Sequence, residues 1–206
     1  MLLFVQAVVA GFERELKDRI LGVVPHISLV GRAPLTNTAE LRSIAEAVDG
    51  VVGTSRVVVG PALLSSGTRV QGVALAGIDP ETYSRVSTVA DYVEGSGFDG
   101  WRGGDFEVVL GAQVAEHIGV AIGDLVTVTL PEAAVTPAGV FPRAKRFLVR
   151  GISDTDSELD ARRVYVHIED AGRLFRLGDQ AHAVQVRLDD PLRAPDVGAA
   201  GLGRVG

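Results

Sequence analysis

The hydrophobic and polar positions of this chain change pattern sharply near its beginning. Residues 1–12 (MLLFVQAVVAGF) are apolar apart from Gln6, whereas residues 13–21 (ERELKDRIL) are densely charged. In the charged half, Glu13 and Lys17 stand four residues apart with the acid first, which is the favourable order on a helix surface. The pattern predicts one continuous helix that passes from an apolar environment into water.

The apolar half of this helix is too short to cross a bilayer by itself. Its twelve residues would extend about 18 Å, whereas a span needs about 20 residues. A secretory signal fits poorly, because no positively charged region precedes the stretch and no small-residue cleavage site follows it. We interpret the stretch as the end of a transmembrane helix that continues into water. The alternative is a buried N-terminal helix of a soluble protein.

Strand and helix patterns then alternate along the chain. Strands are predicted at residues 26–31, 51–64, 70–77, 106–110, 124–131, 146–153, 164–168 and 183–189, and helices at residues 40–48, 79–86, 111–118 and 169–177. Residues 95–104 (GSGFDGWRGG) are predicted to form a flexible, glycine-rich joint. Hairpins mixed with strand–helix pairs favour an α+β fold with two lobes. Residues 191–200 resemble the onset of a helix, so we expect a returning helix and strand to be missing beyond them.

Composition narrows the classes of partner. Hydrophobic residues make up 47% and charged residues 22% of the 206 residues, as in an ordinary globular protein. The net charge is −6 and no lysine- or arginine-rich block is present, so nucleic acid is not expected as a partner. The chain has no cysteine, which excludes disulfides and thiolate metal sites.

Catalytic and cofactor motifs are weak. Residues 95–100 fit the string G-x-G-x-x-G, but Trp101 and Arg102 follow where a dinucleotide site needs a helix to begin. Residues 154–160 contain spaced aspartates without the glycine and the final glutamate of a calcium loop. None of the histidines has metal-ligand spacing; they are His26, His117, His167 and His182. We therefore expect neither an enzyme nor a resident cofactor or metal.

Residues 132–145 (EAAVTPAGVFPRAK) form the most distinctive internal segment. The segment is too long for a tight turn and carries two prolines, a glycine and a bulky pair, Val140 and Phe141, near its tip. Arg143, Lys145 and Arg146 place positive charge at its base in an acidic chain. An apolar tip flanked by cations is typical of a protein-docking element. The alternative is an ordinary long hairpin whose Phe141 folds back into the core.

Several collinear segments resemble LolC/LolE-type permeases, the membrane subunits of the bacterial lipoprotein-releasing ABC transporter. The resemblance covers nearly the whole chain. It is carried by AGFERELKDRILGVVPH (residues 10–26), LAGIDP (75–80), VVLGAQVAEHIGVAIGD (108–124), VTLPEAAVTPAGVFPRAKRF (128–147), YVHIEDAGRLFR (165–176) and VRLDDP (186–191).

This resemblance implies a two-lobed periplasmic domain of the MacB/LolC type, placed between the first and second transmembrane helices. A discontinuous mixed α/β lobe would hold an inserted β-rich lobe. The implied division is residues 1–22 for the membrane helix end and its extension, 23–94 and 181–206 for the first lobe, and 95–180 for the inserted lobe. A protruding loop called the hook would occupy residues 132–146.

The resemblance also implies a function. In the LolC type the hook captures LolA, the periplasmic lipoprotein carrier, and here it would use Thr136, Pro137, Gly139, Val140, Phe141, Pro142, Arg143, Lys145 and Arg146. The other implied partners are a separate ATPase subunit, a second permease copy or paralogue, the lipoprotein substrate and the inner membrane. The domain would face the periplasm.

Two departures and two alternatives accompany this interpretation. The family has four membrane helices, of which this chain holds at most the end of one, and residues 199–206 do not continue the family's returning helix. One alternative is the periplasmic domain of a related MacB/FtsX-type permease that transmits mechanical force to another partner. The other is a soluble α+β binding protein.

Overall fold

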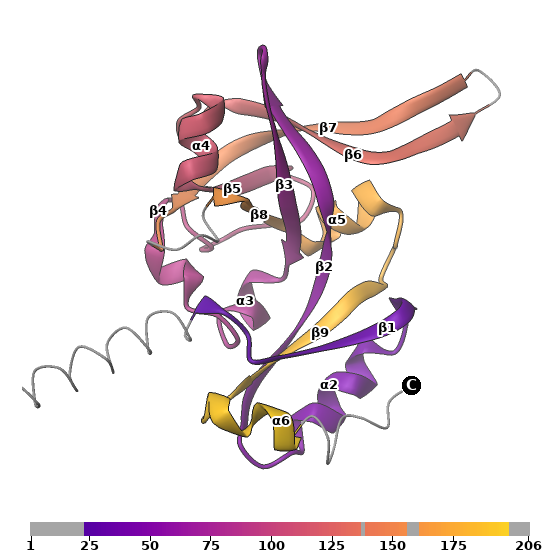
Figure 1. Cartoon of the computed structure of the whole chain (residues 1–206), viewed down its shortest axis with the longest axis vertical. Coiled ribbons are helices and arrows are strands. Elements are labelled where there is room, and N and C mark those ends of the chain that lie inside the picture. Colours follow the sequence, from indigo (N-terminus) through magenta and orange to yellow (C-terminus); the bar gives the residue numbers. More distant parts are fainter. Residues whose placement is uncertain (1–22, 137–138, 156–160, 198–206) are drawn as a thin grey trace, which may run out of the picture.

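A computed structural model describes residues 23–136, 139–155 and 161–197 of the chain (Figure 1). Side chains at residues 132–142 are not part of that description, so the structure gives backbone pairing alone there. The helix predicted over residues 1–21 lies outside the described residues. Within the described part, no helix is both long enough and apolar enough to cross a membrane.

The described residues form a nine-stranded mixed sheet in the order β1-β9-β2-β3-β8-β5-β7-β4, with β6 pairing with β2 and β7. The β3–β8 and β5–β7 pairs are parallel and the remaining pairs are antiparallel. The strands are β1 (Ile27–Leu35), β2 (Val51–Ser66), β3 (Arg69–Ile78), β4 (Val93–Gly95), β5 (Glu107–Gly111), β6 (Leu125–Thr136), β7 (Gly139–Ser153), β8 (Arg163–His167) and β9 (Ala181–Leu188).

The helices are short and lie against this sheet. They are α2 (Thr38–Glu46), α3 (Pro80–Tyr83), α4 (Ala112–Ile118), α5 (Ile168–Phe175) and α6 (Ala194–Val197), with 3₁₀ turns η1 (Val89–Tyr92) and η3 (Pro191–Arg193). Their ends follow local sequence: the Asp79 side chain caps α3, and Gly119 ends α4 in the left-handed conformation. The mixture of strands and helices confirms the predicted α+β class.

Three groups of buried side chains stabilise the fold. One lies between the sheet and helices α4 and α5, and another joins α2 and α6 to β9. The third is aromatic and covers the opposite face of β3 and β8; its rings are Tyr83, Phe98, Trp101 and Tyr165. The long β2–β3 hairpin links these groups, because β2 pairs with β9 toward one end and with β6 toward the other (Figure 1).

The glycine-rich segment at residues 95–104 is not the flexible joint that its composition predicts. The buried Arg150 guanidinium donates hydrogen bonds to three of its carbonyl oxygens, at 2.8, 2.9 and 3.4 Å, and forms an ion pair with Glu107. The same guanidinium lies 4.9 Å from the centre of the Trp101 ring. Phe98 and Trp101 are both buried. The segment is ordered because one cation satisfies backbone oxygens that would otherwise be buried alone.

Helix α5 approaches the sheet closely because β3 carries a glycine beneath it. A Cβ atom added to Gly77 would lie 2.2 Å from the Cβ of Ala171. Gly72, on the same strand, has nothing within 4 Å of the equivalent position. The two glycines therefore have different roles, and only Gly77 sets the distance between helix and sheet.

We predict that Gly77→Ala lowers the free energy of unfolding by about 1–3 kcal/mol, the usual effect of overpacking. Gly72→Ala is the matched control on the same strand and should leave stability unchanged or raise it by up to about 1 kcal/mol. Urea denaturation of the two variants measures both effects. Equal stabilities would show that α5 does not pack as described.

The buried Tyr83 phenol makes the free energy of unfolding depend on pH. Burial raises the pKa of its phenol above the ordinary value, and the nearby Arg163 and a hydrogen bond with Ser87 offset this only in part. Below pH of about 10 the phenol is protonated in both states. At higher pH the unfolded chain releases this proton while the folded chain keeps it, so the free energy of unfolding decreases.

Replacing Tyr83 with phenylalanine should remove that part of the alkaline destabilisation. We predict that the unfolding free energy of the unaltered chain falls more steeply than that of Tyr83→Phe above pH of about 10. Denaturant unfolding of both proteins at pH 8 and pH 11 measures the difference, and the loss of the hydroxyl itself cancels between the two pH values. Parallel pH profiles would contradict the prediction.

Candidate functional site

Strands β6 and β7 continue beyond the rest of the sheet as a two-stranded ribbon (Figure 1). Their pairing extends through Ala133↔Pro142 to Thr136↔Gly139. We call residues 133–136 and 139–142 the arm. The sequence predicted a loop between strands that end at Pro131 and begin at Arg146. That prediction is wrong, since both strands extend into the segment and pair the backbone groups of an otherwise exposed loop.

The arm begins at a β-bulge. Leu130 pairs with Arg143 and Ala133 pairs with Pro142, so Pro131 and Glu132 are extra residues on β6. Proline cannot donate a ladder hydrogen bond, and a bulge bends the strand that contains it. Strand β2 pairs with β6 only across Thr127, Val128 and Thr129, and farther along β6 the two strands diverge (Figure 1). The ribbon therefore leaves the sheet where the pairing of β6 with β2 ends.

The structure places the predicted site residues in two groups. The residues of the arm are located by their backbone pairing. Val135 pairs with Val140, and Ala134 pairs with Phe141. Pro137 lies outside the described residues. The backbone of Phe141 is thus in the arm, while the position of its side chain is not described.

The second group lies at the base of the arm on β7. Arg143 and Lys145 are two residues apart and share one face of the strand, whereas Arg146 belongs to the other face. The Arg143 guanidinium donates a hydrogen bond to the carbonyl oxygen of Phe175 at the end of α5, at 3.4 Å. The Lys145 ammonium lies 4.0 Å from the centre of the Phe106 ring, a cation–π contact. The base is therefore in contact with α5 and with the residue before β5.

Sequence patterns did not identify the residues of the domain that lie near the base of the arm. Phe106 packs edge-to-face on Phe147, with ring centres 5.6 Å apart, and Arg173 of α5 lies 5.9 Å from the Phe106 ring centre. Neither Phe106 nor Arg173 has a local pattern that marks it. Both are distant from residues 132–146 in sequence, so only the sheet order brings them to the arm.

A buried carboxylate positions Phe106. Asp170 is fully buried, and its carboxylate accepts hydrogen bonds from the backbone N–H of Gly104 at 2.8 Å and of Phe106 at 3.3 Å. It also forms an ion pair with Arg173 at 2.9 Å. Phe106 has a φ of +51°, in the left-handed region. Asp170 holds the chain in this conformation as it enters β5.

Three of the four histidines accept hydrogen bonds from the backbone. The Nδ1 atoms of His26, His167 and His182 each accept a hydrogen bond from a main-chain N–H. His167 does so as the N-terminal cap of α5. No group of three or more His, Cys, Asp or Glu side chains in the described parts of the chain could hold a metal ion.

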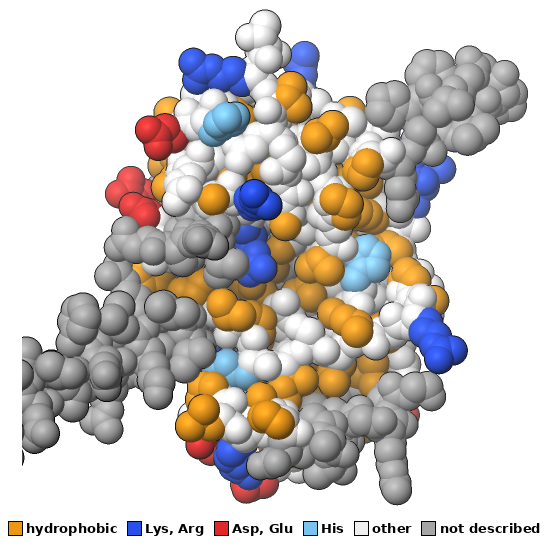
Figure 2. Space-filling view, in the orientation of Figure 1, with side chains coloured by type: hydrophobic (Ala, Val, Ile, Leu, Met, Phe, Trp, Pro, Cys, Tyr) orange, Lys and Arg blue, Asp and Glu red, His pale blue; other side chains and the backbone are white. Residues whose placement is uncertain are grey.

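Two cavities lie along the β2–β3 hairpin, and Figure 2 shows apolar side chains over the middle of the molecule, where this hairpin runs. Their volumes are about 370 and 660 Å³. Apolar or small residues such as Val59, Leu63 and Ala74 line most of their walls, with Arg162 and Arg163 at the edges. Neither lining contains a carboxylate, histidine, serine or threonine side chain.

The sequence matches the MacB-like periplasmic core domain over residues 1–200. The chain belongs to this family. It is 34% identical over 197 residues to the lipoprotein-releasing system transmembrane protein LolC of Neisseria meningitidis serogroup B, covering 94% of this chain and 47% of that protein. It is 27% identical over 192 residues to LolE of the same kind of system from Haemophilus influenzae, covering 89% of this chain and 45% of that protein. The predicted resemblance to LolC/LolE-type proteins is confirmed.

A solved structure shares the fold. The extracellular domain of the noncanonic ABC-type transporter YknZ from Gram-positive bacteria aligns with a TM-score of 0.51 at 16% identity, over 82% of this chain and 80% of that one. The MacB-like, α+β architecture predicted from the sequence is thereby confirmed. The chain spans about half the length of the curated relatives that it matches.

We predict that Asp170→Ala lowers the free energy of unfolding by about 1–3 kcal/mol. The change removes the acceptor of the partly buried N–H groups of Gly104 and Phe106, and it leaves Arg173 with Glu169 as its ion-pair partner. Asp170→Asn is the graded control, because its amide oxygen can still accept from one N–H, and its stability should fall between the other two. Denaturant unfolding measures the order, and an alanine variant as stable as the unaltered chain would contradict it.

Proposed function

We propose that this chain is the periplasmic domain of an ABC transporter permease subunit that releases lipoproteins from the inner membrane. In this proposal the arm and its base dock a periplasmic lipoprotein carrier of the LolA kind. The observation that carries the proposal is the arm itself, a ribbon that leaves the sheet at a bulge and bears the hook pattern Thr136–Arg146. The related proteins LolC and LolE are named as transmembrane proteins of lipoprotein-releasing systems.

The geometry suits docking for a physical reason. Strand pairing fixes the arm in an extended form, and prolines at 137 and 142 further restrict the unbound chain. A recognition element that is ordered before binding loses less conformational entropy when its partner arrives. Contacts of Arg143 and Lys145 with Phe175 and Phe106 attach the base of the arm to the body.

The remaining parts of the proposal concern the whole transporter. Residues 1–22 would anchor the domain to the inner membrane, with residues 23–94 and 181–206 forming the first lobe and residues 95–180 the inserted one. A separate ATPase subunit would supply the energy, and a second permease copy or paralogue would complete the complex. Changes in the membrane part would reach the arm through the sheet.

We predict that Phe141→Ala combined with Arg143→Ala weakens binding of a purified LolA-type carrier at least about tenfold, as expected when interface anchors are truncated. Isothermal titration of the 206-residue chain measures the affinity. Because Arg143 is hydrogen-bonded to the end of α5, circular dichroism and denaturant unfolding must show that the double variant stays folded.

The matched control removes a similar pair far from the arm. Val30 is 70% exposed on the edge strand β1, and Arg32 is exposed nearby on the same strand. Val30→Ala combined with Arg32→Ala should leave carrier affinity unchanged. A folded arm variant that binds the carrier as tightly as this control would refute the docking role.

The MacB-like family membership favours one rival, a permease domain that transmits force to a different periplasmic partner. The two proposals differ in what the arm binds. Capture of a transenvelope or cell-wall protein by the unaltered chain but not by the arm variant, without carrier binding, would support the rival.

A further inference from the structure

One face of the β2–β3 hairpin is apolar and partly open to solvent. Along β2, three apolar residues alternate on this face, and each pairs with a small residue of β3; the pairs are Val59↔Ala76, Pro61↔Ala74 and Leu63↔Gly72. Val59 and Leu63 are 42% and 45% exposed. We call this face, with the two cavities that its residues line, the groove. Clustered apolar side chains on a surface are typical of a binding site.

The glycine in the groove has no reason in the fold itself. Gly72 lies in the interior of β3, its φ is not in the left-handed region, and the pairing of β2 with β3 has no bulge there. A Cβ atom added to Gly72 would meet nothing within 4 Å, in contrast to Gly77. Glycine weakens a strand interior, and it often marks a place where a ligand or another backbone approaches closely. Gly72 therefore marks the part of the groove that an occupant would approach most closely.

Two arginines at the edges of the groove supply positive charge. Arg163 pairs with Ala74 at the start of β8 and lines the smaller cavity, and Arg162 lines the larger one. Within the described part of the chain, neither guanidinium forms an ion pair or a hydrogen bond. The groove thus combines apolar walls with positive charge, although the whole chain has a net charge of −6. Its occupant should carry both apolar and negatively charged groups.

The groove lies between the first described residue and the arm. Tyr83 lines the smaller cavity and belongs to the aromatic group that buries Val23, with which the described chain begins. Pro131, at the bulge where β6 turns toward the arm, lines the larger cavity. A molecule that moved from the anchored end of the domain to the arm would therefore pass over the groove.

We propose that the groove binds a polypeptide segment of the lipoprotein cargo, with apolar and acidic side chains, before the cargo reaches the carrier. This inference rests on the proposed function and concerns the cargo instead of the carrier. In an extended segment, side chains two residues apart lie on the same side. Apolar side chains can then fill the space over Gly72 and Ala74, while carboxylates pair with Arg162 and Arg163 at the edges.

Two other occupants fit the groove less well. In a symmetric pair of copies of this chain the same face meets itself, so the arginines of both copies would share an interface whose cavity linings contain no carboxylate. Like charges brought together in an interface cost free energy. A bilayer surface is flat, whereas helix α6 and the arm lie toward opposite ends of the molecule with the β2–β3 hairpin between them (Figure 1).

Filling the groove tests binding without disturbing the fold. Gly72→Val places a β-branched side chain in the open space on a strand, so its unfolding midpoint should equal or exceed that of the unaltered chain. The probe is a synthetic peptide in which valine and aspartate alternate, titrated calorimetrically into the 206-residue chain. Gly72→Val should weaken its binding at least about fivefold. Arg162→Gln combined with Arg163→Gln should weaken it about three- to tenfold at low ionic strength and less at high salt.

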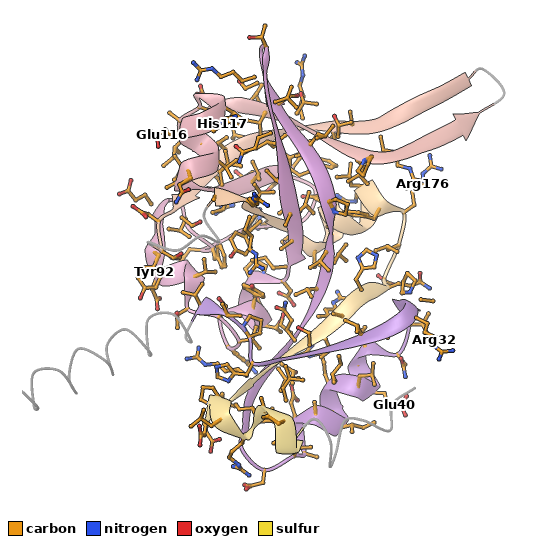
Figure 3. All side chains as sticks on the ribbon, in the orientation of Figure 1. Arg32, Glu40, Tyr92, Glu116, His117 and Arg176 are labelled. Atoms are coloured by element: carbon orange, nitrogen blue, oxygen red, sulfur yellow. The ribbon has the colours of Figure 1, made fainter. Side chains whose placement is uncertain are left out.

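The controls are Ala33→Val and Arg32→Gln. Both residues are exposed on β1, which β9 separates from β2, and Figure 3 shows the position of Arg32. Neither change should alter the affinity for the peptide, and a peptide with lysine in place of aspartate should bind the unaltered chain at least about fivefold more weakly. Equal affinities of Gly72→Val and Ala33→Val would overturn the inference. So would a valine–aspartate peptide that fails to bind the unaltered chain.

Site-specific crosslinking identifies the occupant. Benzoylphenylalanine replaces Gly72 or, as the control, Arg32 in the complete permease subunit, which is assembled with its ATPase and loaded with a purified lipoprotein. On illumination, the lipoprotein should crosslink to position 72 and not to position 32. Crosslinks from position 72 only to a second permease copy or to lipid, or no crosslink there, would overturn the inference. Carrier binding by the arm is measured separately with the unaltered chain, so the proposed function stands or fails independently of this result.

Discussion

The antiparallel pairing of β2 with β3 is the constraint on which the rest of this domain depends. The pairing runs without a break from Val57↔Ile78 to Ser66↔Arg69. Near the start of β2, β9 pairs with residues up to Val57, and near its end β6 pairs with Leu63, Leu64 and Ser65. One hairpin therefore joins the group around α2 and α6 to the group that carries the arm. Its register decides where β6 begins and hence where the arm leaves the sheet.

Most elements could be predicted from sequence because they have a clear period and clear ends. The helix patterns at residues 111–118 and 169–177, with a glycine or histidine at their limits, match α4 and α5 to within two residues. Short elements were missed. Strand β4 has three residues and pairs only with β7, and η1 precedes it directly, so neither has enough residues for a period to show.

Two further sequence predictions were wrong because the tertiary structure decides the local conformation. Prolines and glycine in residues 132–145 suggested a loop, but the ribbon tolerates them because each strand has only one neighbour there and its other edge is free. Residues 95–104 appeared flexible from composition, and Arg150, which lies far along the chain, orders them. The candidate site was predicted in the same uneven way. Its basic residues on β7 were found, while the residues that they contact from α5 were not.

Two non-glycine residues near the base of the arm, Phe106 and Arg176, have positive φ angles. A chain selected for stability alone would place glycine at the end of α5, where Arg176 stands. A fully buried carboxylate, that of Asp170, also accepts a hydrogen bond from the backbone of Phe106 and keeps it in place. Both departures from local conformational preference therefore lie where α5 and the start of β5 meet the base of the arm.

The pairing of strand β7 determines how the domain would respond to a pull on the arm. Beyond the arm it pairs with β6, with β5 and finally with β4, and it carries Arg150, which is bound to the loop after β4. A pull on the arm directed along β7 would load the hydrogen bonds of these three neighbours together, instead of opening them one after another. The same strand that reaches outward is thus paired with three other strands, so tension at the tip would move the domain as a unit before it unravelled the sheet.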